Sequence, residues 1–373
     1  MSRVALLWFG FLTYFNFYTC CTILRIDLTK RRLKNPNRFI KAVVYFGNIL
    51  PLVSMPYSLA LNFEHTQLYV ANPLALSAHN VNAVMRFLVV TVVIVTIRNR
   101  DARLTKWLEK AMEIQVQYFD RFSQVPKDIS HRKWLYLNSI ISVIHNIITA
   151  ISAYNESKKN IHALDGADLD GLFCMVTCQH MYMLHHAALL CYMRECLSTL
   201  HNQLRIGQFD ADLSFIYYNI RKLLHELNGI YNPVLLVIHL CLIISNSLVG
   251  YVVLLTMMIP ELSSGLFLYL FGGKVYLLFL VHMYIYYELC DSVEKMVKET
   301  DDILKEISTP NTNSEYDKPL ERQLDMIALT KSLYERGVNV CGLFNTNLSF
   351  LFAVFAQTVM YIIVLIQIDY ANL

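Results

Sequence analysis

A line of polar side chains with helical spacing runs along the last apolar stretch of the chain. This stretch, Cys341 to Ile368, has no charged residue and is about 28 residues long, enough for a helix to cross a membrane. Its polar residues recur at steps of three or four, which places them on one face of a helix. They are Thr346, Ser349, Gln357, Tyr361 and Gln367, with Ala353 and Val364 at the remaining steps. Because amides in lipid lack hydrogen-bond partners, this face must meet either another helix or the water of a pore.

Two cations lie inside other apolar stretches, where a charge is costly unless it faces a cavity or a partner. Arg86 could also extend its guanidinium to the lipid headgroups. Lys274 follows Gly272 and Gly273, where small residues leave room for a cavity. Both cations are therefore candidates for a ligand pocket.

Histidines and other polar side chains occur together in a further apolar segment, Gly171–Met193. His185 and His186 are adjacent and point in different directions, and His180 has no Asp or Glu nearby, so the pattern does not predict a zinc site. We expect these histidines to hydrogen-bond across helices. Gln179, nearer the outer end of this segment, is a candidate for the wall of a ligand pocket. Tyr276, in the apolar segment Gly265–Tyr287, is another.

A bundle of membrane helices must position these residues. The chain has 373 residues, of which 55% are hydrophobic and 16% charged, against about 25% charged in soluble domains. The sequence predicts an all-α polytopic membrane protein with seven transmembrane helices. These spans are Phe39–Phe63, His79–Ile97, Trp134–Tyr154, Gly171–Met193, Pro233–Pro260, Gly265–Tyr287 and Cys341–Ile368.

The distribution of Lys and Arg predicts the direction of the chain. With the N-terminus cytoplasmic and the C-terminus extracellular, only Lys158 and Lys159 fall in outer segments, and Arg86 and Lys274 fall within spans. All other Lys and Arg belong to inner segments, as the positive-inside rule requires. The same topology places the sequon at Asn155 outside, where it could be glycosylated.

Amphipathic patterns between the spans predict helices on the cytoplasmic side. Their apolar faces need a partner, so we expect them to pack into an anchor bundle that a homo-oligomer could share. In residues 1–38, an N-terminal segment, residues 4–24 fit either a span or a helix lying on the membrane. The other predicted parts are helices one to four in 39–193, a cytoplasmic extension in 194–232, helices five and six in 233–287, anchor helices and a loop in 288–340, and the last helix in 341–373.

The end of the last span resembles the C-terminal signature of the insect gustatory receptors. That signature is Thr-Tyr, five hydrophobic residues and Gln-Phe; here Tyr361, five apolar residues and Gln367 match, with Met360 in place of Thr and Ile368 in place of Phe. The resemblance extends over the whole chain in length, spans and orientation. It implies a tetrameric ligand-gated cation channel, related to the insect odorant receptors, in the plasma membrane of sensory neurons.

The resemblance also implies functional residues and partners. The last helix of each subunit would line the pore, and Ile368 would keep a hydrophobic gate beside Gln367. A small organic tastant, a bitter compound being favoured, would bind among the outer halves of helices two to six. The implied pore residues are Gln357, Tyr361, Val364, Gln367 and Ile368, and the ligand-binding candidates are Arg86, Gln179, Lys274 and Tyr276. Partners would be membrane lipid, the tastant, and either identical subunits or other gustatory receptors.

Two other classes fit less well. A G-protein-coupled receptor would have its N-terminus outside, and the chain has neither an Asp/Glu-Arg-Tyr triplet nor an Asn-Pro-x-x-Tyr motif. A secondary transporter would show repeats and broken helices, whereas this chain has only 12 Gly and 9 Pro. No catalytic, metal or cofactor motif is present, so we predict no enzyme, and nothing predicts nucleic-acid binding. The identity of the tastant and the need for a co-receptor stay open.

Overall fold

Long helices make up almost all of the computed structural model, which describes residues 72–119, 130–159, 166–206, 211–258, 266–308, 318–334 and 337–371 and short pieces between residues 25 and 53. The main helices are α4 (Pro73–Ile114), α5 (Ser130–Lys159), α6 (Gly166–Arg205), α7 (Ala211–Met258), α8 (Leu266–Ser308), α9 (Lys318–Leu333) and α10 (Leu348–Ala371), and the π-helical turn η1 (Gln115–Phe119) follows α4. Two antiparallel hairpins join β1 (Arg25–Asp27) to β2 (Arg32–Lys34) and β3 (Asn339–Val340) to β4 (Phe344–Asn345). The all-α prediction is confirmed.

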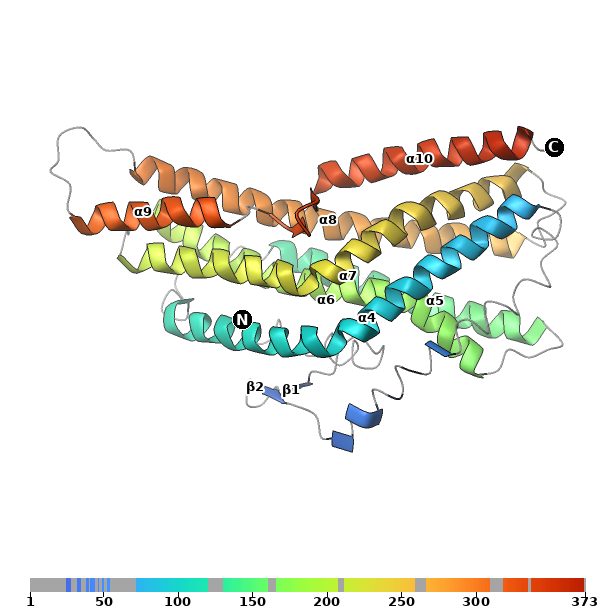
Figure 1. Ribbon diagram of the computed structural model, residues 1–373, viewed down its shortest axis with the longest axis horizontal. Coiled ribbons are helices and arrows are strands. Elements are labelled where there is room, and N and C mark those ends of the chain that lie inside the picture. Colours follow the sequence, from blue (N-terminus) through green and yellow to red (C-terminus); the bar gives the residue numbers. More distant parts are fainter. Residues whose placement is uncertain are drawn as a thin grey trace.

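Four of the helices are far longer than a membrane is thick. Helices α4, α6, α7 and α8 have 42, 40, 48 and 43 residues, which corresponds to about 60–70 Å each. A hydrocarbon core is only about 30 Å thick. A helix of this length that crosses a bilayer continues well beyond it, and Figure 1 shows these helices running side by side along the long axis of the molecule.

Three of the described helices are long and apolar enough to cross a membrane. They cover Pro73–Phe119, Leu213–Leu255 and Leu348–Tyr370, and contain the second and most of the fifth and seventh predicted spans. The third and fourth predicted spans lie within α5 and α6, and the sixth lies within α8 from Leu266 onward. The first, Phe39–Phe63, falls largely outside the described residues. The count of seven and the orientation of the termini stay predictions.

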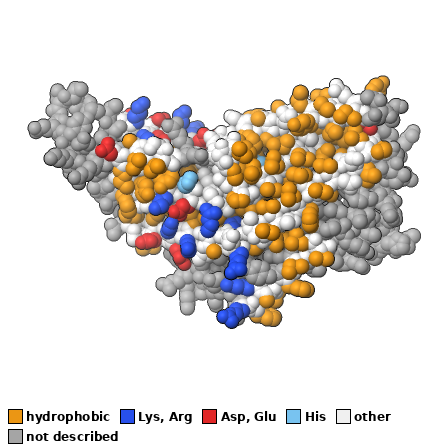
Figure 2. Space-filling model, in the orientation of Figure 1, with side chains coloured by type: hydrophobic (Ala, Val, Ile, Leu, Met, Phe, Trp, Pro, Cys, Tyr) orange, Lys and Arg blue, Asp and Glu red, His pale blue; other side chains and the backbone are white. Residues whose placement is uncertain are grey.

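Apolar and charged side chains separate along the molecule. In Figure 2, apolar side chains cover the half that holds α10 and the neighbouring parts of α7 and α4, whereas Lys, Arg, Asp and Glu gather toward the other half. A surface rich in apolar side chains suits lipid, and a charged surface suits water. This separation agrees with helices that leave the membrane and enter an aqueous compartment.

Helix α7 continues through Pro233, where the sequence had predicted the start of a span. Proline lacks an N–H and its ring crowds the preceding turn, so it kinks a helix that it does not end. Figure 1 shows α7 changing direction near its middle, and Pro233 lies inside the helix. The segment before Pro233 therefore belongs to the same continuous helix as the fifth predicted span.

In the charged half of the molecule, helices α6, α7, α8 and α9 share one hydrophobic core. Leu197 of α6, Leu224 of α7 and Val293 of α8 are buried in it, together with Ile327 of α9. In water, burial of each such side chain contributes about 1.5–3 kcal/mol to stability. The amphipathic segments predicted beside the membrane thus find apolar partners within their own chain.

A buried ionic network fixes this half of the molecule. Arg221, 0% exposed, donates from Nη1 to the Tyr217 hydroxyl at 2.7 Å and lies 3.4 Å from Asp301 Oδ1. The Tyr217 hydroxyl in turn donates to Asp301. Arg221 Nη2 donates to the Tyr334 carbonyl at 2.5 Å, and Lys331 Nζ donates to the Asp301 carbonyl at 2.8 Å. The network ties α7 and α8 to α9 and to the residue that follows α9.

The last helix begins later than predicted. Instead of a helix from Cys341, the chain forms the β3–β4 hairpin, whose turn has Cys341 at φ 54° and Gly342 at φ 74°. Glycine adopts this conformation without strain. Asn347 then caps α10, since its Oδ1 accepts the Phe350 N–H at 3.0 Å. Thr346 is therefore buried in front of α10 rather than placed on its polar face.

Candidate functional site

The first candidate site is the outward face of α10. This helix packs against α7 and α8, and its Val354 and Thr358 are buried there. A Cβ atom at Gly250 of α7 would collide with Ile362 of α10, so the two helices approach closely. In Figure 1, α10 lies along the edge of the bundle.

All five predicted pore residues lie on the exposed side of α10. The exposed fractions are 47% for Tyr361, 44% for Val364 and 45% for Ile368. Gln357 and Gln367 are also exposed. These residues lie outside the face that packs against α7, but so do apolar residues such as Phe352 and Ile363, so their role in a pore stays a prediction.

Polar contacts hold both ends of α10. At the C-terminal end, Asn72 Nδ2 donates to Asp369 Oδ1 at 2.9 Å and Oδ2 at 3.1 Å, which joins α10 to the start of α4. At the other end, Asn347 Nδ2 donates to Glu294 Oε2 of α8 at 3.3 Å. Sequence reasoning missed Asn72 and Asp369. An Asn before Pro73 is a typical helix-start signal and would have drawn attention to Asn72.

The second candidate site is a group of three buried histidines, His145, His180 and His282, which we call the histidine cluster. They come from α5, α6 and α8. The ring centroids of His145 and His180 are 4.5 Å apart, and those of His180 and His282 are 4.9 Å apart. His282 Nδ1 lies 2.5 Å from Asn138 Oδ1 and 3.3 Å from Ser142 Oγ. Three predicted spans thus share one polar contact region.

Arg86 lies on α4, which packs against α6. Its Nε donates to Asn82 Oδ1 at 3.3 Å, and it is an electrostatic neighbour of His145 and His180. Gln179 is buried on α6 next to His180. The structure therefore brings Arg86, and the turn of α6 that carries Gln179, to a single region.

Three further predicted site residues have side chains outside the described part of the structure. Lys274 and Tyr276 lie within α8, and Asn155 lies near the end of α5. Their roles stay predictions. Among the residues that the structure describes, no group of three or more His, Cys, Asp and Glu is arranged to hold a metal ion.

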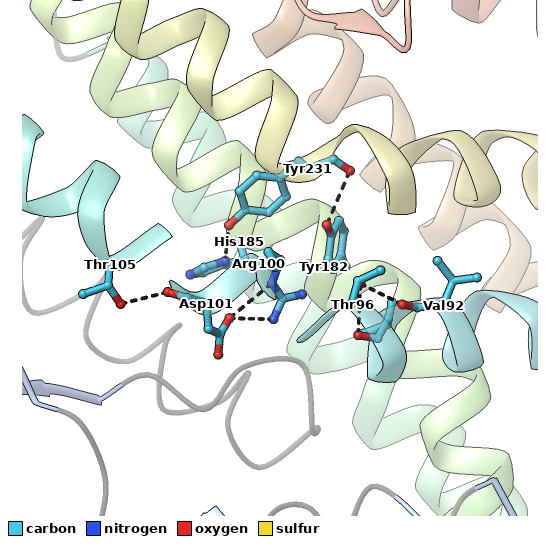
Figure 3. A network of polar contacts seen from close by, with 9 residues as sticks. Val92, Thr96, Arg100, Asp101, Thr105, Tyr182, His185 and Tyr231 are labelled. Atoms are coloured by element: carbon cyan, nitrogen blue, oxygen red, sulfur yellow. Dashed lines mark hydrogen bonds and ion pairs between the residues drawn. The ribbon is translucent and has the colours of Figure 1, made fainter. Parts of the chain in front are cut away.

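Next to the histidine cluster, a polar network crosses from α4 to α7 (Figure 3). Tyr231 Oη lies 2.6 Å from His185 Nδ1, and the Tyr182 hydroxyl donates to the Tyr231 carbonyl at 3.4 Å. The Arg100 guanidinium lies 5.2 Å from the centre of the Tyr182 ring and pairs with Asp101 at 3.0 Å. As expected from the sequence, His185 of α6 makes a hydrogen bond to another helix.

A chain of aromatic contacts continues to the base of α10. His186 Nδ1 lies 2.8 Å from Tyr286 Oη, and the Tyr286 and Tyr287 rings are 5.7 Å apart. Tyr287 then contacts Phe350 of α10 at 6.0 Å between ring centroids, and Phe350 stacks on Phe344 at 4.2 Å. We call His186, Tyr286, Tyr287 and Phe350 the aromatic path, because it joins α6 and α8 to α10.

The sequence matches the family described as the 7tm chemosensory receptors from residue 3 to residue 372. The chain belongs to the 7tm chemosensory receptor family. The resemblance seen in the C-terminal signature is thereby confirmed for the family as a whole, and the family is one of receptors rather than enzymes. A comparison with curated proteins gave no match.

Solved structures of a chemosensory receptor share the fold. The insect olfactory receptor OR5 from Machilis hrabei, in complex with eugenol, superposes with a TM-score of 0.71 at 11% identity, over 99% of this chain and 100% of that one. The OR5 structure described without eugenol gives a TM-score of 0.62 at the same identity and coverage. At this identity the likeness establishes the fold alone.

Sequence reasoning missed part of the receptor's histidine cluster. It did not single out His145, although Asn138, Ser142 and His145 recur at i, i+4 and i+7 in an apolar segment. That spacing places all three on one face of a helix, and polar groups inside a membrane usually face a partner or a cavity. The same argument that found the polar line of α10 would have found this face of α5.

Proposed function

We propose that this chemosensory receptor is a gustatory receptor, a tastant-gated non-selective cation channel whose pore is lined by α10. The exposed polar line of α10 carries this proposal. Glutamine and tyrosine side chains exposed to lipid would lose hydrogen bonds at a cost of several kcal/mol. Closure of identical subunits around a symmetry axis would instead turn these faces toward one another and toward water. A homotetramer, or a heteromer with other gustatory receptors, satisfies this requirement.

The gate lies near the C-terminal end of α10 in this proposal. Val364 and Ile368 add apolar side chains to the polar line within one turn of Gln367. An apolar constriction can stop ions by excluding water from a narrow pore. The bond between Asn72 and Asp369 would set the position of this end of α10 relative to α4.

The tastant would bind at the histidine cluster, among α4, α5, α6 and α8. His282 and Tyr286 are separated by one turn of α8, so a ligand that moves α8 at His282 also moves the aromatic path at Tyr286. Phe350 at the end of that path belongs to α10. The receptor would act in the plasma membrane of sensory neurons, and a bitter compound is the favoured ligand on the resemblance to gustatory receptors.

Replacement of Gln367 by Ala tests the pore assignment. We expect an altered permeability ratio between Na⁺, K⁺ and Ca²⁺, because an amide that faces permeating ions is removed. The measurement is the reversal potential of whole-cell currents in cells that express only this chain, stimulated with a panel of bitter compounds and sugars while G-protein signalling is blocked.

Phe355→Ala is the control for this variant. Phe355 is 55% exposed and lies about 120° around α10 from Gln367. Its replacement by Ala should therefore leave the permeability ratios unchanged. Equal reversal potentials for the wild type and Gln367→Ala would contradict a pore-lining role for Gln367. A response abolished by the G-protein block would favour a G-protein-coupled receptor instead.

Replacement of Asp369 by Ala tests the contact between α10 and α4. Loss of two hydrogen bonds to a carboxylate removes about 1.5–3 kcal/mol from the arrangement seen here, so the tastant concentration for half-maximal current should shift at least about tenfold. Tyr370→Ala, at a neighbouring residue that is 81% exposed, should leave the dose–response curve in place. Coincident curves for the two variants would show that the contact has no part in gating.

A further inference from the structure

We infer that the region of Arg86 and the histidine cluster selects ligands that carry a carboxylate. This inference rests on the proposed function and adds the chemical class of the ligand. Three observations carry it: the sign of the charges within the spans, the contacts of Arg86, and buried polar atoms of the cluster that lack partners.

The charges within the ligand-binding spans are all positive. The second to sixth predicted spans, His79–Ile97, Trp134–Tyr154, Gly171–Met193, Pro233–Pro260 and Gly265–Tyr287, contain no Asp or Glu, and their charged residues are Arg86 and Lys274. A charge inside a membrane is retained where an opposite charge or a water-filled cavity compensates it. An anion from outside the chain would supply this compensation.

Arg86 has capacity for such an anion. Its guanidinium has five N–H donors and donates to Asn82 Oδ1 at 3.3 Å. Within the residues that the structure describes, no carboxylate forms an ion pair with Arg86. Guanidinium and carboxylate groups match each other in geometry, since two parallel N–H donors meet two oxygens.

Two buried polar atoms at the cluster have no hydrogen-bond partner among the described residues. Asn138 and His282 are 1% and 2% exposed, and neither Asn138 Nδ2 nor His282 Nε2 has a hydrogen-bond partner among the described residues. A buried polar atom left unpaired costs about 1–3 kcal/mol. A ligand with a second polar group would satisfy these atoms while its carboxylate meets Arg86, and the histidine rings would contact its apolar part.

The same positive charge would repel a ligand that carries an ammonium group. Phenylacetate, phenylacetamide and phenethylamine share a benzyl group and differ in charge, so they separate charge from shape. We expect phenylacetate to bind about 10- to 100-fold more tightly than phenylacetamide, the range that a charge-assisted hydrogen bond confers. Phenethylamine should bind least.

The test uses the purified full-length receptor and each of the three compounds. Ligand-dependent shifts of the melting temperature give the affinities, and whole-cell currents give the responses. Arg86→Gln should bring the affinities for phenylacetate and phenylacetamide within about threefold of each other, and Arg86→Lys should keep part of the preference. Asn80→Ala, at an exposed residue of α4, should keep all of it.

Equal affinities of the wild type for the acid and the amide would overturn the inference, as would an unchanged preference in Arg86→Gln. A lipid phosphate is the alternative source of the anion. If phosphatidylglycerol vesicles stabilise the wild type but not Arg86→Gln, while phenylacetate stabilises neither, the site holds a lipid headgroup and the inference is wrong.

Ligand-independent current separates this inference from the proposed function. The gate variant Ile368→Ser, described below, should conduct without any ligand. If it conducts while no carboxylate binds the wild type, the channel stands and the ligand class is wrong. If it does not conduct and the wild type gives no current with the three compounds or with the tastant panel, the proposed function fails as well.

Discussion

Replacement of Asp301 by Ala should destabilise the receptor by about 3–5 kcal/mol, because it leaves the guanidinium of Arg221 buried without its counterion. Arg221 is 0% exposed and Asp301 is 4% exposed, so water cannot easily take the place of the lost carboxylate. The hydroxyl of Tyr217 would lose its acceptor at the same time. The measurement is the melting temperature of the purified receptor, together with the fraction of receptor at the cell surface.

Asp302→Ala is the matched control. Asp302 has the same side chain, is adjacent in the sequence and is exposed, so its removal should change stability by less than about 0.5 kcal/mol. The double variant Arg221→Met with Asp301→Leu should recover much of the loss, since apolar residues can replace a buried ion pair. Equal melting temperatures for Asp301→Ala and Asp302→Ala would contradict a stabilising role for the network.

The network also affects the position of α10, the helix proposed to line the pore. Arg221 donates to the carbonyl of Tyr334, which follows α9 on the way to the β3–β4 hairpin. Asn228 Nδ2 donates to the carbonyl of Gly337 at 3.0 Å, three residues further along the chain. Helix α7 therefore holds the segment that leads into α10 at two points. A stable charged half gives α10 a fixed base from which its other end can move.

Much of this fold follows from the length of uncharged sequence alone. An uncharged run of about 20 residues has few stable structures other than a membrane helix, and this consideration locates the apolar helices. It cannot locate where a helix begins within such a run. Cys341 has no feature that predicts a positive φ, and only Gly342 hints at the turn that delays α10 until Leu348.

The two candidate sites also differ in how far the sequence predicts them. The polar line of α10 lies on one helix, so its period of about 3.5 residues shows it directly in the sequence. The histidine cluster comes from three helices, and the meeting of His145, His180 and His282 depends on how those helices pack. Periodicity can place each residue on a face, as it does for Asn138 and Ser142. It cannot show which faces meet.

Replacement of Ile368 by Ser should produce a channel that conducts without a tastant. In the proposed pore, a serine hydroxyl would hydrate a constriction that the isoleucine side chain would keep free of water, and the change would occur once in every subunit. We expect basal whole-cell current at least about tenfold above that of the wild type, carried by the same cations as the current evoked by a tastant.

Ile363→Ser is the control for Ile368→Ser, because it distinguishes hydration of the gate from a general loosening of α10. Ile363 is 47% exposed and Ile368 is 45% exposed, so the same substitution is made at two similarly accessible sites of one helix. The two residues lie about 140° apart around the helix axis, and only Ile368 is one of the predicted pore residues. If both variants leak equally, α10 has been loosened rather than its gate hydrated. A leak confined to Ile368→Ser, with surface expression equal in both, would place the barrier to ions at the end of α10 that Asp369 holds against α4.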